Sequence, residues 1–334
     1  MPSSNKPILQ VQDLQVEFHT DSGVVQAVNG VSFDLYPGET LGIVGESGSG
    51  KSVTNLTMLG LTPQPPGKVV GGSVKYDGLE LLSLNQKQWQ QVRGKKIAMI
   101  FQDPMTALNP FLTVEEQLVE VTMLHMGFNR TEASEHAVGL LRKVGIPGAE
   151  KRIRDYPHQF SGGMRQRVMI AMAISCQPDI LIADEPTTAL DVTIQAQILE
   201  LMKSMQEEFG TAIIFITHDL GVVANVCDRV MVMYAGRKVE LSTTTNIFRQ
   251  PRHPYTVGLL NSAPRWDQGE EDLQAIDGQP PDLLDLPSGC SFNPRCQYVE
   301  DDCRKEIPQL VSLNGEIPHQ HACLRDITTL KEDV

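Results

Sequence analysis

The sequence predicts an α/β fold with a largely parallel central sheet. Three short apolar segments are typical of buried strands: Thr40–Val44, and the starts of Asp179–Pro186 and Ala212–Asp219. They are followed by a glycine-rich loop, a pair of carboxylates and a histidine, respectively. Because ligands of parallel α/β sheets bind at the carboxyl ends of the strands, we expect these polar residues to meet at one edge of the sheet.

Composition narrows the classes of protein that fit. The 334 residues carry a formal net charge of −13 and only 5% are aromatic, which disfavours a nucleic-acid-binding surface. Residues 265–334 include 15 acidic and 6 basic residues, so the acidity is concentrated in the C-terminal tail. No secretory signal is evident, and no apolar run approaches the roughly 18 residues of a membrane helix. We therefore expect an intracellular protein that reaches a membrane only through a partner.

A phosphate-binding loop follows the first predicted strand. The segment reads Gly45-x-x-x-x-Gly50-Lys51-Ser52 and leads into a stretch with apolar residues at helical spacing. The glycines let backbone N–H groups turn toward phosphate oxygens; Lys51 can reach the β- and γ-phosphates, and the Ser52 hydroxyl can ligate Mg²⁺. The alternative is a glycine-rich turn that binds nothing, which the strand, the Lys-Ser pair and the helix together disfavour.

Two carboxylates and a histidine end the other two predicted strands. Asp184 is suited to contacting Mg²⁺, and Glu185 to polarising a water for in-line attack on the γ-phosphate. A pair of acidic residues that caps a helix is the alternative. A histidine after a strand is more often structural, but at this sheet edge His218 is a candidate for contacting the γ-phosphate or the attacking water.

A second anion site is predicted at Ser161-Gly162-Gly163, directly before a helical pattern. Backbone N–H groups and the helix dipole face outward at such a helix start, although an ordinary turn before a helix is the alternative. The site lies about 20 residues before the carboxylate pair. With its neighbours it reads Phe-Ser-Gly-Gly-Met, from Phe160 to Met164, and resembles the LSGGQ signature motif of ABC transporter ATPases, with Met164 in place of the glutamine.

The other motifs of that family occur in the family's order. The segment Met99–Pro110 resembles the Q-loop, with Gln102 near Mg²⁺ and the attacking water, and Thr188–Asp191 resembles the D-loop. His218 matches the switch histidine. Phe18 matches the aromatic residue that stacks on adenine, although a core position on an antiparallel strand would explain it equally well.

The resemblance implies ATP and Mg²⁺ as ligands. It implies catalytic roles for Lys51, Gln102, Glu185 and His218, and contacts to Mg²⁺ from Ser52, Gln102 and Asp184. The nucleotide-binding residues that it implies are Phe18, Gly45, Glu46, Ser47, Gly48, Ser49, Gly50, Lys51, Ser52, Val53, Gln102, Ser161, Gly162, Gly163, Asp184 and Asp191.

The resemblance also implies an architecture. It is the P-loop NTPase fold of ABC ATPases, with a RecA-like mixed sheet core, an antiparallel β subdomain and an α-helical subdomain at about 89–175. The nucleotide-binding domain is expected to cover residues 1–260, with an irregular extension at 261–334. Two such domains dimerise head to tail, so that Ser161 of one chain faces the ATP of the other. ATP binding closes the dimer and hydrolysis reopens it.

The end of the chain resembles a particular subfamily. Arg252–Leu260 and the cysteine-containing segment after Gly289 are similar to the C-terminal region of oligopeptide and dipeptide importer ATPases. That resemblance implies two integral-membrane permease subunits, an extracytoplasmic peptide-binding protein, and a second related ATPase or a second copy of the chain. It also implies a peripheral location on the cytoplasmic face of the inner membrane. No nucleic-acid partner is expected, given the net charge and the few aromatic residues. Importers of nickel, glutathione and some oligosaccharides use similar ATPases, so peptide cargo is inferred by analogy only.

Two other classes fit the sequence less well. A soluble ABC ATPase of DNA repair or translation would carry inserted coiled coils or a second cassette. A regulatory module that binds ATP without hydrolysing it would have a degraded carboxylate pair or switch histidine. Neither feature is found in the sequence.

Four cysteines lie in the tail, at Cys290, Cys296, Cys303 and Cys323. Disulfides are disfavoured in the reducing compartment expected for this ATPase. An acidic tail with little core of its own could be stabilised by a metal, and such irregular spacing suits a 4Fe–4S cluster at least as well as Zn²⁺. The subfamily resemblance favours the cluster; zinc, with His319 or His321 as further ligands, and free thiols stay as alternatives. The remaining two, Cys176 and Cys227, are predicted to be packing residues.

Overall fold

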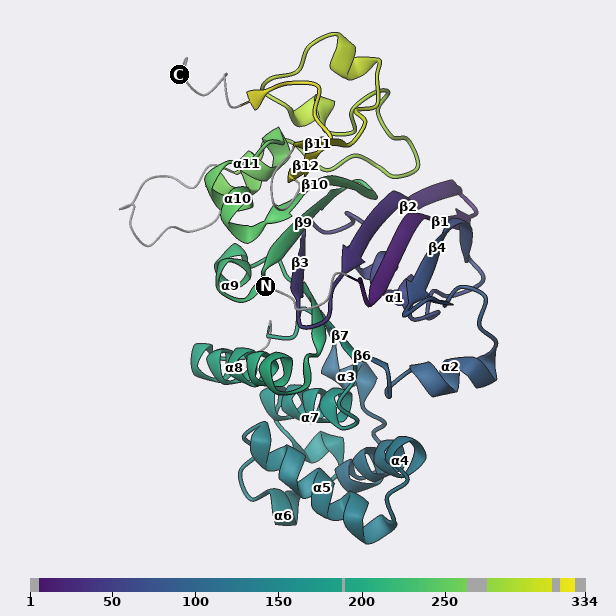
Figure 1. The fold of residues 1–334 in the computed structure, drawn as a ribbon, viewed down its shortest axis with the longest axis vertical. Helices are drawn as coiled ribbons and strands as arrows, with labels where there is room; N and C mark the ends of the chain where they lie inside the picture. Colours follow the sequence, from purple (N-terminus) through teal and green to yellow (C-terminus); the bar gives the residue numbers. More distant parts are fainter. Residues whose placement is uncertain (1–5, 188–189, 263–274, 314–318, 328–334) are drawn as a thin grey trace. The chain divides into compact units, whose positions relative to one another are not determined.

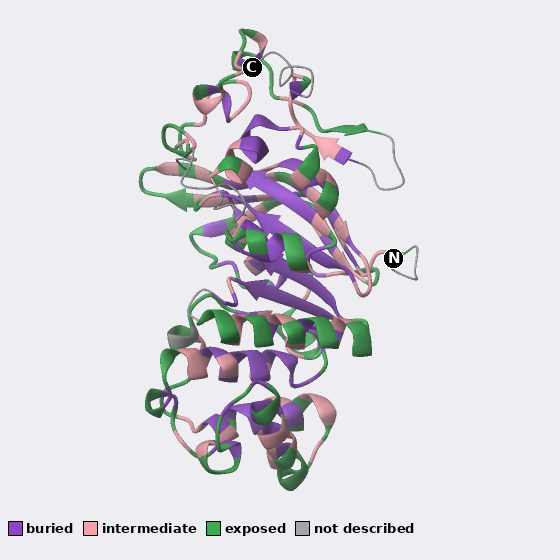
Figure 2. Cartoon of the chain, turned by 90° about the vertical axis from the view of Figure 1, so that its left-hand side faces the viewer, coloured by how far each residue is buried: buried purple, intermediate pink, exposed green. Residues whose placement is uncertain are grey.

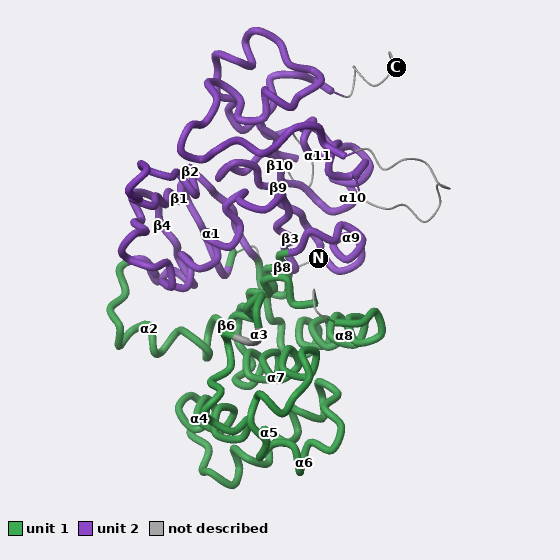
Figure 3. Tube along the Cα trace, turned by 180° about the vertical axis from the view of Figure 1, so that it is seen from behind, with its two compact units in different colours: residues 1–7, 36–39, 83–216 green, residues 8–35, 40–82, 217–334 purple. Residues whose placement is uncertain are grey.

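The computed structural model describes residues 6–187, 190–262, 275–313 and 319–327 (Figure 1). The chain forms two compact units, shown in different colours in Figure 3. Unit 1 comprises residues 1–7, 36–39 and 83–216, and unit 2 comprises residues 8–35, 40–82 and 217–334. Each unit is therefore assembled from segments that are far apart in the sequence.

Unit 2 contains an antiparallel sheet with the strand order β2-β1-β4-β5. The inward-facing residues of the long strand β1, among them Leu9, Val11, Leu14 and Val16, are almost completely buried. A register shift after Val11 breaks the strict alternation. This sheet confirms the predicted antiparallel β subdomain. Its strands are β1 (Leu9–Thr20), β2 (Gly23–Leu35), β4 (Gly67–Tyr76) and β5 (Leu79–Glu80).

The second part of unit 2 is a mixed sheet with its helices. Strand β3 is parallel to β9, β10 is antiparallel to β9, and β12 and β11 continue the sheet beyond β10. The strands are β3 (Thr40–Val44), β9 (Arg229–Tyr234), β10 (Arg237–Thr243), β11 (Val311–Leu313) and β12 (His319–His321). The helices are α1 (Lys51–Met58), α9 (Leu220–Val226), α10 (Thr244–Arg249) and α11 (Pro254–Asn261), with 3-10 turns at Asn293–Arg295 and Asp302–Arg304.

Unit 1 combines a parallel sheet with a group of helices. The strands β6 (Ile97–Ile100), β7 (Ile180–Asp184) and β8 (Ala212–Ile216) lie in the order β6-β7-β8. Every residue of β7 and β8 is buried, as their unbroken apolar sequences predict (Figure 2). The helices are α2 (Gln86–Val92), α3 (Pro104–Ala107), α4 (Val114–Met126), α5 (Arg130–Lys143), α6 (Ala149–Arg152), α7 (Gly162–Ile174) and α8 (Val192–Phe209), with a 3-10 turn at Pro157–Gln159.

Local sequence explains where the helices of unit 1 begin. Helix α4 starts with a capping box, in which Thr113 and Glu116 each accept the other's backbone N–H. Helix α5 repeats the arrangement with Asn129 and Glu132. No helix in the described residues is long and apolar enough to cross a membrane.

The three predicted strands are confirmed as β3, β7 and β8. The tail after residue 275 is mostly irregular, as predicted, but the short strands β11 and β12 were not anticipated. They arise because the edge of β10 is open to pairing: Glu240 and Leu241 pair with His321 and Gln320. The segment 263–274, part of the predicted extension, lies outside the described residues.

A buried carboxylate holds the tail to the sheet. Glu240 on β10 has no exposed surface. Its carboxylate accepts the backbone N–H groups of Arg252 (2.7 Å) and His253 (3.0 Å), and it pairs with the ring Nε2 of His319 on β12 at 2.7 Å. One side chain thus connects β10, the start of α11 and the tail.

We expect the substitution Glu240→Ala to destabilise the protein by about 3 kcal/mol, because it leaves the buried N–H of His253, the partly buried N–H of Arg252 and the ring of His319 without their acceptor. The measurement is urea-induced unfolding of the purified chain. Glu207→Ala, which removes an exposed carboxylate from an ion pair on α8, is the control and should cost less than about 1 kcal/mol. Equal losses for the two variants would contradict the role of Glu240.

Candidate functional site

The predicted phosphate loop connects β3 to α1 in unit 2. Gly45 and Gly50 have φ angles of +152° and +99°. A Cβ atom at Gly45 would lie 2.3 Å from the carbonyl oxygen of Met233, and one at Gly50 would lie 2.5 Å from that of Ala27. Only glycine fits at either position, so the backbone itself forms this part of the loop.

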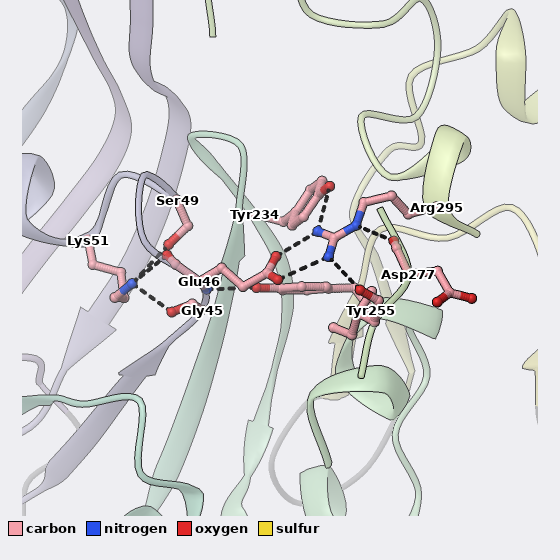
Figure 4. A network of polar contacts seen from close by, with 9 residues as sticks. Gly45, Glu46, Ser49, Lys51, Tyr234, Tyr255, Asp277 and Arg295 are labelled. Carbon is pink, nitrogen blue, oxygen red and sulfur yellow. Dashed lines mark hydrogen bonds and ion pairs between the residues drawn. The ribbon is translucent and has the colours of Figure 1, made fainter. Parts of the chain in front are cut away.

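The side chain of Lys51 curls over its own loop. Its Nζ donates to the carbonyl oxygens of Gly45 (2.7 Å) and Glu46 (2.8 Å) and to the hydroxyl of Ser49 (3.1 Å), as Figure 4 shows. The neighbouring Ser52 is exposed in the first turn of α1. The loop therefore holds an ammonium group and a hydroxyl at the start of a helix, an arrangement suited to a phosphate and to an oxygen-preferring cation.

Glu46 is anchored at the side of this loop. Its carboxylate makes a two-pronged pair with the guanidinium of Arg295, and its backbone N–H donates to the Tyr255 hydroxyl at 2.8 Å (Figure 4). The carboxylate raises the pKa of Arg295 above its already high value. Glu46 is predicted as part of the loop, but its two partners are not predicted from the sequence. The one signal for them is an acidic residue inside a phosphate-binding loop.

The catalytic candidates of unit 1 lie at the ends of its strands. Asp184, the last residue of β7, is buried, and Glu185 follows it with a φ of +48°. The backbone N–H of Glu185 donates to the Ile216 carbonyl at 2.9 Å. Gln102, which follows β6, donates from Nε2 to the Glu185 carboxylate at 3.1 Å. The parallel strands thus bring together Gln102 and Glu185, which are 83 positions apart.

The serine-glycine-glycine segment begins helix α7. Ser161 is the N-cap residue, and its hydroxyl accepts the backbone N–H of Met164 at 3.3 Å. A further residue, which was not predicted, links helix α7 to the segment after β7. Gln166 is buried, and its side chain donates to the Pro186 carbonyl at 2.7 Å. A polar residue among the apolar positions of the helix was the available signal.

The remaining candidates occupy separate positions. In unit 1, Asp191 caps α8 and accepts the N–H of Ile194 at 3.0 Å, while Thr188 and Ala189 of the predicted D-loop lie outside the described residues. In unit 2, Phe18 is partly exposed near the end of β1, and His218 is exposed after β8. The roles of all these residues stay predictions.

The four tail cysteines line one small cavity of about 10 Å³, together with His253. Burial, with the neighbouring thiols as a smaller contribution, raises the pKa of Cys296 to about 11 and that of Cys323 to about 12. A metal would therefore have to displace the thiol protons.

The tail cysteines and histidines are the candidate metal ligands. Among the described residues, no three His, Cys, Asp or Glu side chains converge as ligands of one ion. His319 is held by Glu240, and neither His319 nor His321 lines the cysteine cavity. The iron–sulfur cluster and zinc therefore stay predictions. Outside the tail, Cys176 and Cys227 are buried, which confirms the prediction that they are packing residues.

Two known protein families match the chain, one in its first two thirds and one toward its C-terminal end. The family described as "ABC transporter" matches residues 28–188, which include the phosphate loop, the signature segment and the carboxylates. The family described as "Oligopeptide/dipeptide transporter, C-terminal region" matches residues 239–303, from β10 to the third tail cysteine.

Individual relatives and solved structures agree. The chain is 51% identical to the oligopeptide transport ATP-binding protein OppD of Salmonella typhimurium over 98% of this chain and 97% of that one. It is 57% identical to the dipeptide transport ATP-binding protein DppD of Bacillus subtilis over 90% of each.

A solved dimeric ATP-binding cassette in a post-hydrolysis state, bound to ADP and Pi, is similar in structure. The match covers 71% of this chain and 98% of that one, with a TM-score of 0.64 and 28% identity. The cbiO1 protein of Clostridium perfringens, part of an ABC transporter complex, matches 74% and 92%, with a TM-score of 0.61 and 28% identity. The chain therefore belongs to the ABC transporter family, among the ATP-binding subunits of oligopeptide and dipeptide transporters.

Proposed function

We propose that this chain hydrolyses ATP to power the import of oligopeptides or dipeptides across a bacterial cytoplasmic membrane. The observation that carries the proposal is the similarity over nearly the whole chain to oligopeptide transport ATP-binding proteins, including the cysteine-containing C-terminal region. That region favours a transport subunit over a soluble ABC ATPase of DNA repair or translation.

The phosphate loop binds the triphosphate in this proposal. Backbone N–H groups between Gly45 and Ser52 cradle the phosphates. The Lys51 ammonium exchanges the carbonyl and hydroxyl partners of its own loop for β- and γ-phosphate oxygens. The aromatic ring of Phe18 stacks on the adenine. The oxygen atoms of Ser52, Gln102 and Asp184 suit Mg²⁺, which neutralises charge on the phosphates when bound.

Glu185 acts as the general base in this proposal. Its carboxylate accepts a proton from the water that attacks the γ-phosphate, and the Gln102 amide holds that carboxylate in place through the 3.1 Å hydrogen bond. The positive φ of Glu185 and its backbone contact to β8 fix the residue where β7 ends. His218 contacts the γ-phosphate or the water.

Two ATPase chains act together across a head-to-tail interface. Ser161, Gly162 and Gly163 begin helix α7 with outward N–H groups that suit the γ-phosphate held by the other chain. Asp191, at the start of α8, belongs to the same interface. The relative solved as a dimer with ADP and Pi supports this assembly. A second related ATPase or a second copy of this chain fills the other position.

The other partners follow from the family. Two integral-membrane permease subunits carry the cargo, and an extracytoplasmic peptide-binding protein delivers it. The ATPase sits on the cytoplasmic face of the membrane. The names of the similar proteins support peptide as cargo, while nickel, glutathione or oligosaccharide is the alternative.

We expect Glu185→Gln to retain ATP binding and to lower ATP turnover by at least about 100-fold, because the general base is lost while the shape of the side chain is kept. The measurements are nucleotide retention and phosphate release by the purified chain. Glu207→Gln on the exposed face of α8 serves as the control. Near-normal turnover in Glu185→Gln would refute the role of Glu185.

Peptide transport predicts that the chain co-purifies with two polytopic membrane subunits. We expect ATP hydrolysis by that complex to rise when the extracytoplasmic binding protein is loaded with peptide, because cargo delivery and ATPase closure share one cycle. The measurement is phosphate release in vesicles with peptide, nickel, glutathione or oligosaccharide. Stimulation by one of the last three alone would replace peptide as the cargo.

We further propose that the tail cysteines hold a 4Fe–4S cluster. The grouping of the four tail cysteines around one cavity supports this proposal. Thiolates from all four cysteines would ligate iron and brace the irregular tail, whose own core is small.

Chain purified without oxygen is expected to contain iron and sulfide with visible absorption, and Cys303→Ser should lose most of both because a buried ligand is removed. Cys176→Ser, which changes a packing thiol in unit 1, is the matched control and should keep the iron. Metal and sulfide analysis checks this. Colourless protein with stoichiometric zinc would defeat the cluster.

A further inference from the structure

The phosphate loop contains a negative charge that has to be kept away from its ligand. Glu46 directly follows Gly45, and its carboxylate extends away from Lys51 (Figure 4). Phosphates bound to the loop would repel this carboxylate if it turned toward them. Its position is fixed by a residue nearly 250 positions further along the chain, Arg295.

The guanidinium of Arg295 is held in one orientation by its surroundings. Its side chain is only 4% exposed, and Nη1 and Nη2 donate to the two carboxylate oxygens of Glu46 at 2.7 and 3.0 Å. The other contacts of the guanidinium are to the carbonyl oxygens of Asp277 (2.9 Å) and Ile276 (3.2 Å) and to the hydroxyl of Tyr234 (3.3 Å). Such a planar, fully engaged fork cannot be replaced by a lysine without loss of geometry.

The backbone of the same loop residue is fixed as well. The Tyr255 hydroxyl accepts the N–H of Glu46 at 2.8 Å, and Tyr255 is completely buried on α11. Its ring packs against those of Tyr234 and Phe292, and the Arg295 guanidinium lies 5.9 and 6.0 Å from the centroids of these two rings. All these residues belong to unit 2, so loop, helix α11 and tail form one network.

We propose that Arg295 is a positioning residue for ATP binding, which neutralises Glu46 and holds its carboxylate outside the phosphate site. The tail then contributes directly to ATP affinity through Arg295. This inference rests on ATP binding by the loop and is independent of the cargo and of the tail metal.

A purely structural role of the Arg295–Glu46 ion pair can be distinguished from a role in ATP binding. If the pair only fastened the tail, removal of either partner would lower stability, with no specific effect on ATP. If Arg295 shields the phosphates from Glu46, its loss harms ATP binding only while the Glu46 carboxylate remains. The double variant separates the two roles.

The test measures ATP hydrolysis and binding of a non-hydrolysable ATP analogue by the full chain. We expect Arg295→Met to raise the KM for ATP and the Kd of the analogue by about 10-fold with a much smaller change in kcat, because the uncompensated carboxylate opposes binding. The effect should shrink at high salt. Arg295→Lys should retain part of the affinity, and Glu46→Gln/Arg295→Met should bind more tightly than Arg295→Met alone.

Arg325→Met is the matched control, since Arg325 pairs with Glu300 and Asp302 inside the tail. It should leave the KM for ATP unchanged. An equal rise in KM for Arg325→Met, or no recovery in the double variant, would overturn the inference in favour of general tail disruption. Equal affinity of Arg295→Met and the unmodified chain would refute this inference alone, whereas failure of the unmodified chain to bind ATP would refute the ATPase assignment itself.

Discussion

The backbone of the phosphate loop passes so close to two carbonyl oxygens that no Cβ atom fits at Gly45 or Gly50, and the conformation of the loop depends on this close packing. The carbonyl of Met233 at the end of β9 closes the space at Gly45, and that of Ala27 on β2 closes it at Gly50. A hydrogen bond from the Gly236 N–H to the Ser49 carbonyl, at 3.1 Å, adds a third support. Both sheets of unit 2 therefore shape the backbone of the loop.

The same loop connects the nucleotide site to the tail. Tyr255 on α11 fixes the backbone of Glu46 and Arg295 fixes its side chain, while Glu240 joins β10 to β12 further along. The segment 217–334 accordingly belongs to the same compact unit as the loop. The described part of the tail has few buried apolar side chains. Buried hydrogen bonds and ion pairs therefore hold it to the rest of unit 2.

In unit 1 the parallel strands β6, β7 and β8 position the candidate catalytic residues. Asp184 ends β7 in a buried position, and the backbone of Glu185 then turns into the left-handed region, held by Ile216 of β8. The contact between Gln102 and Glu185 follows because β6 and β7 are neighbours in the sheet. A strained backbone at such a site is kept only where its surroundings enforce it, and here two adjacent strands supply that support.

Short sequence patterns are sufficient to predict the phosphate loop, the three buried strands and the start of helix α7. Each of these is a local pattern, in which residue type and spacing over a few positions decide the backbone conformation and the chemistry. The folded chain is needed to show that Arg295 meets Glu46, that His319 meets Glu240 and that β12 extends the sheet beyond β10. These pairs are separated by tens to hundreds of residues, and their meeting depends on strand register and on the course of an irregular tail. Many charged residues in the chain could have formed such pairs, and only the three-dimensional packing selects among them.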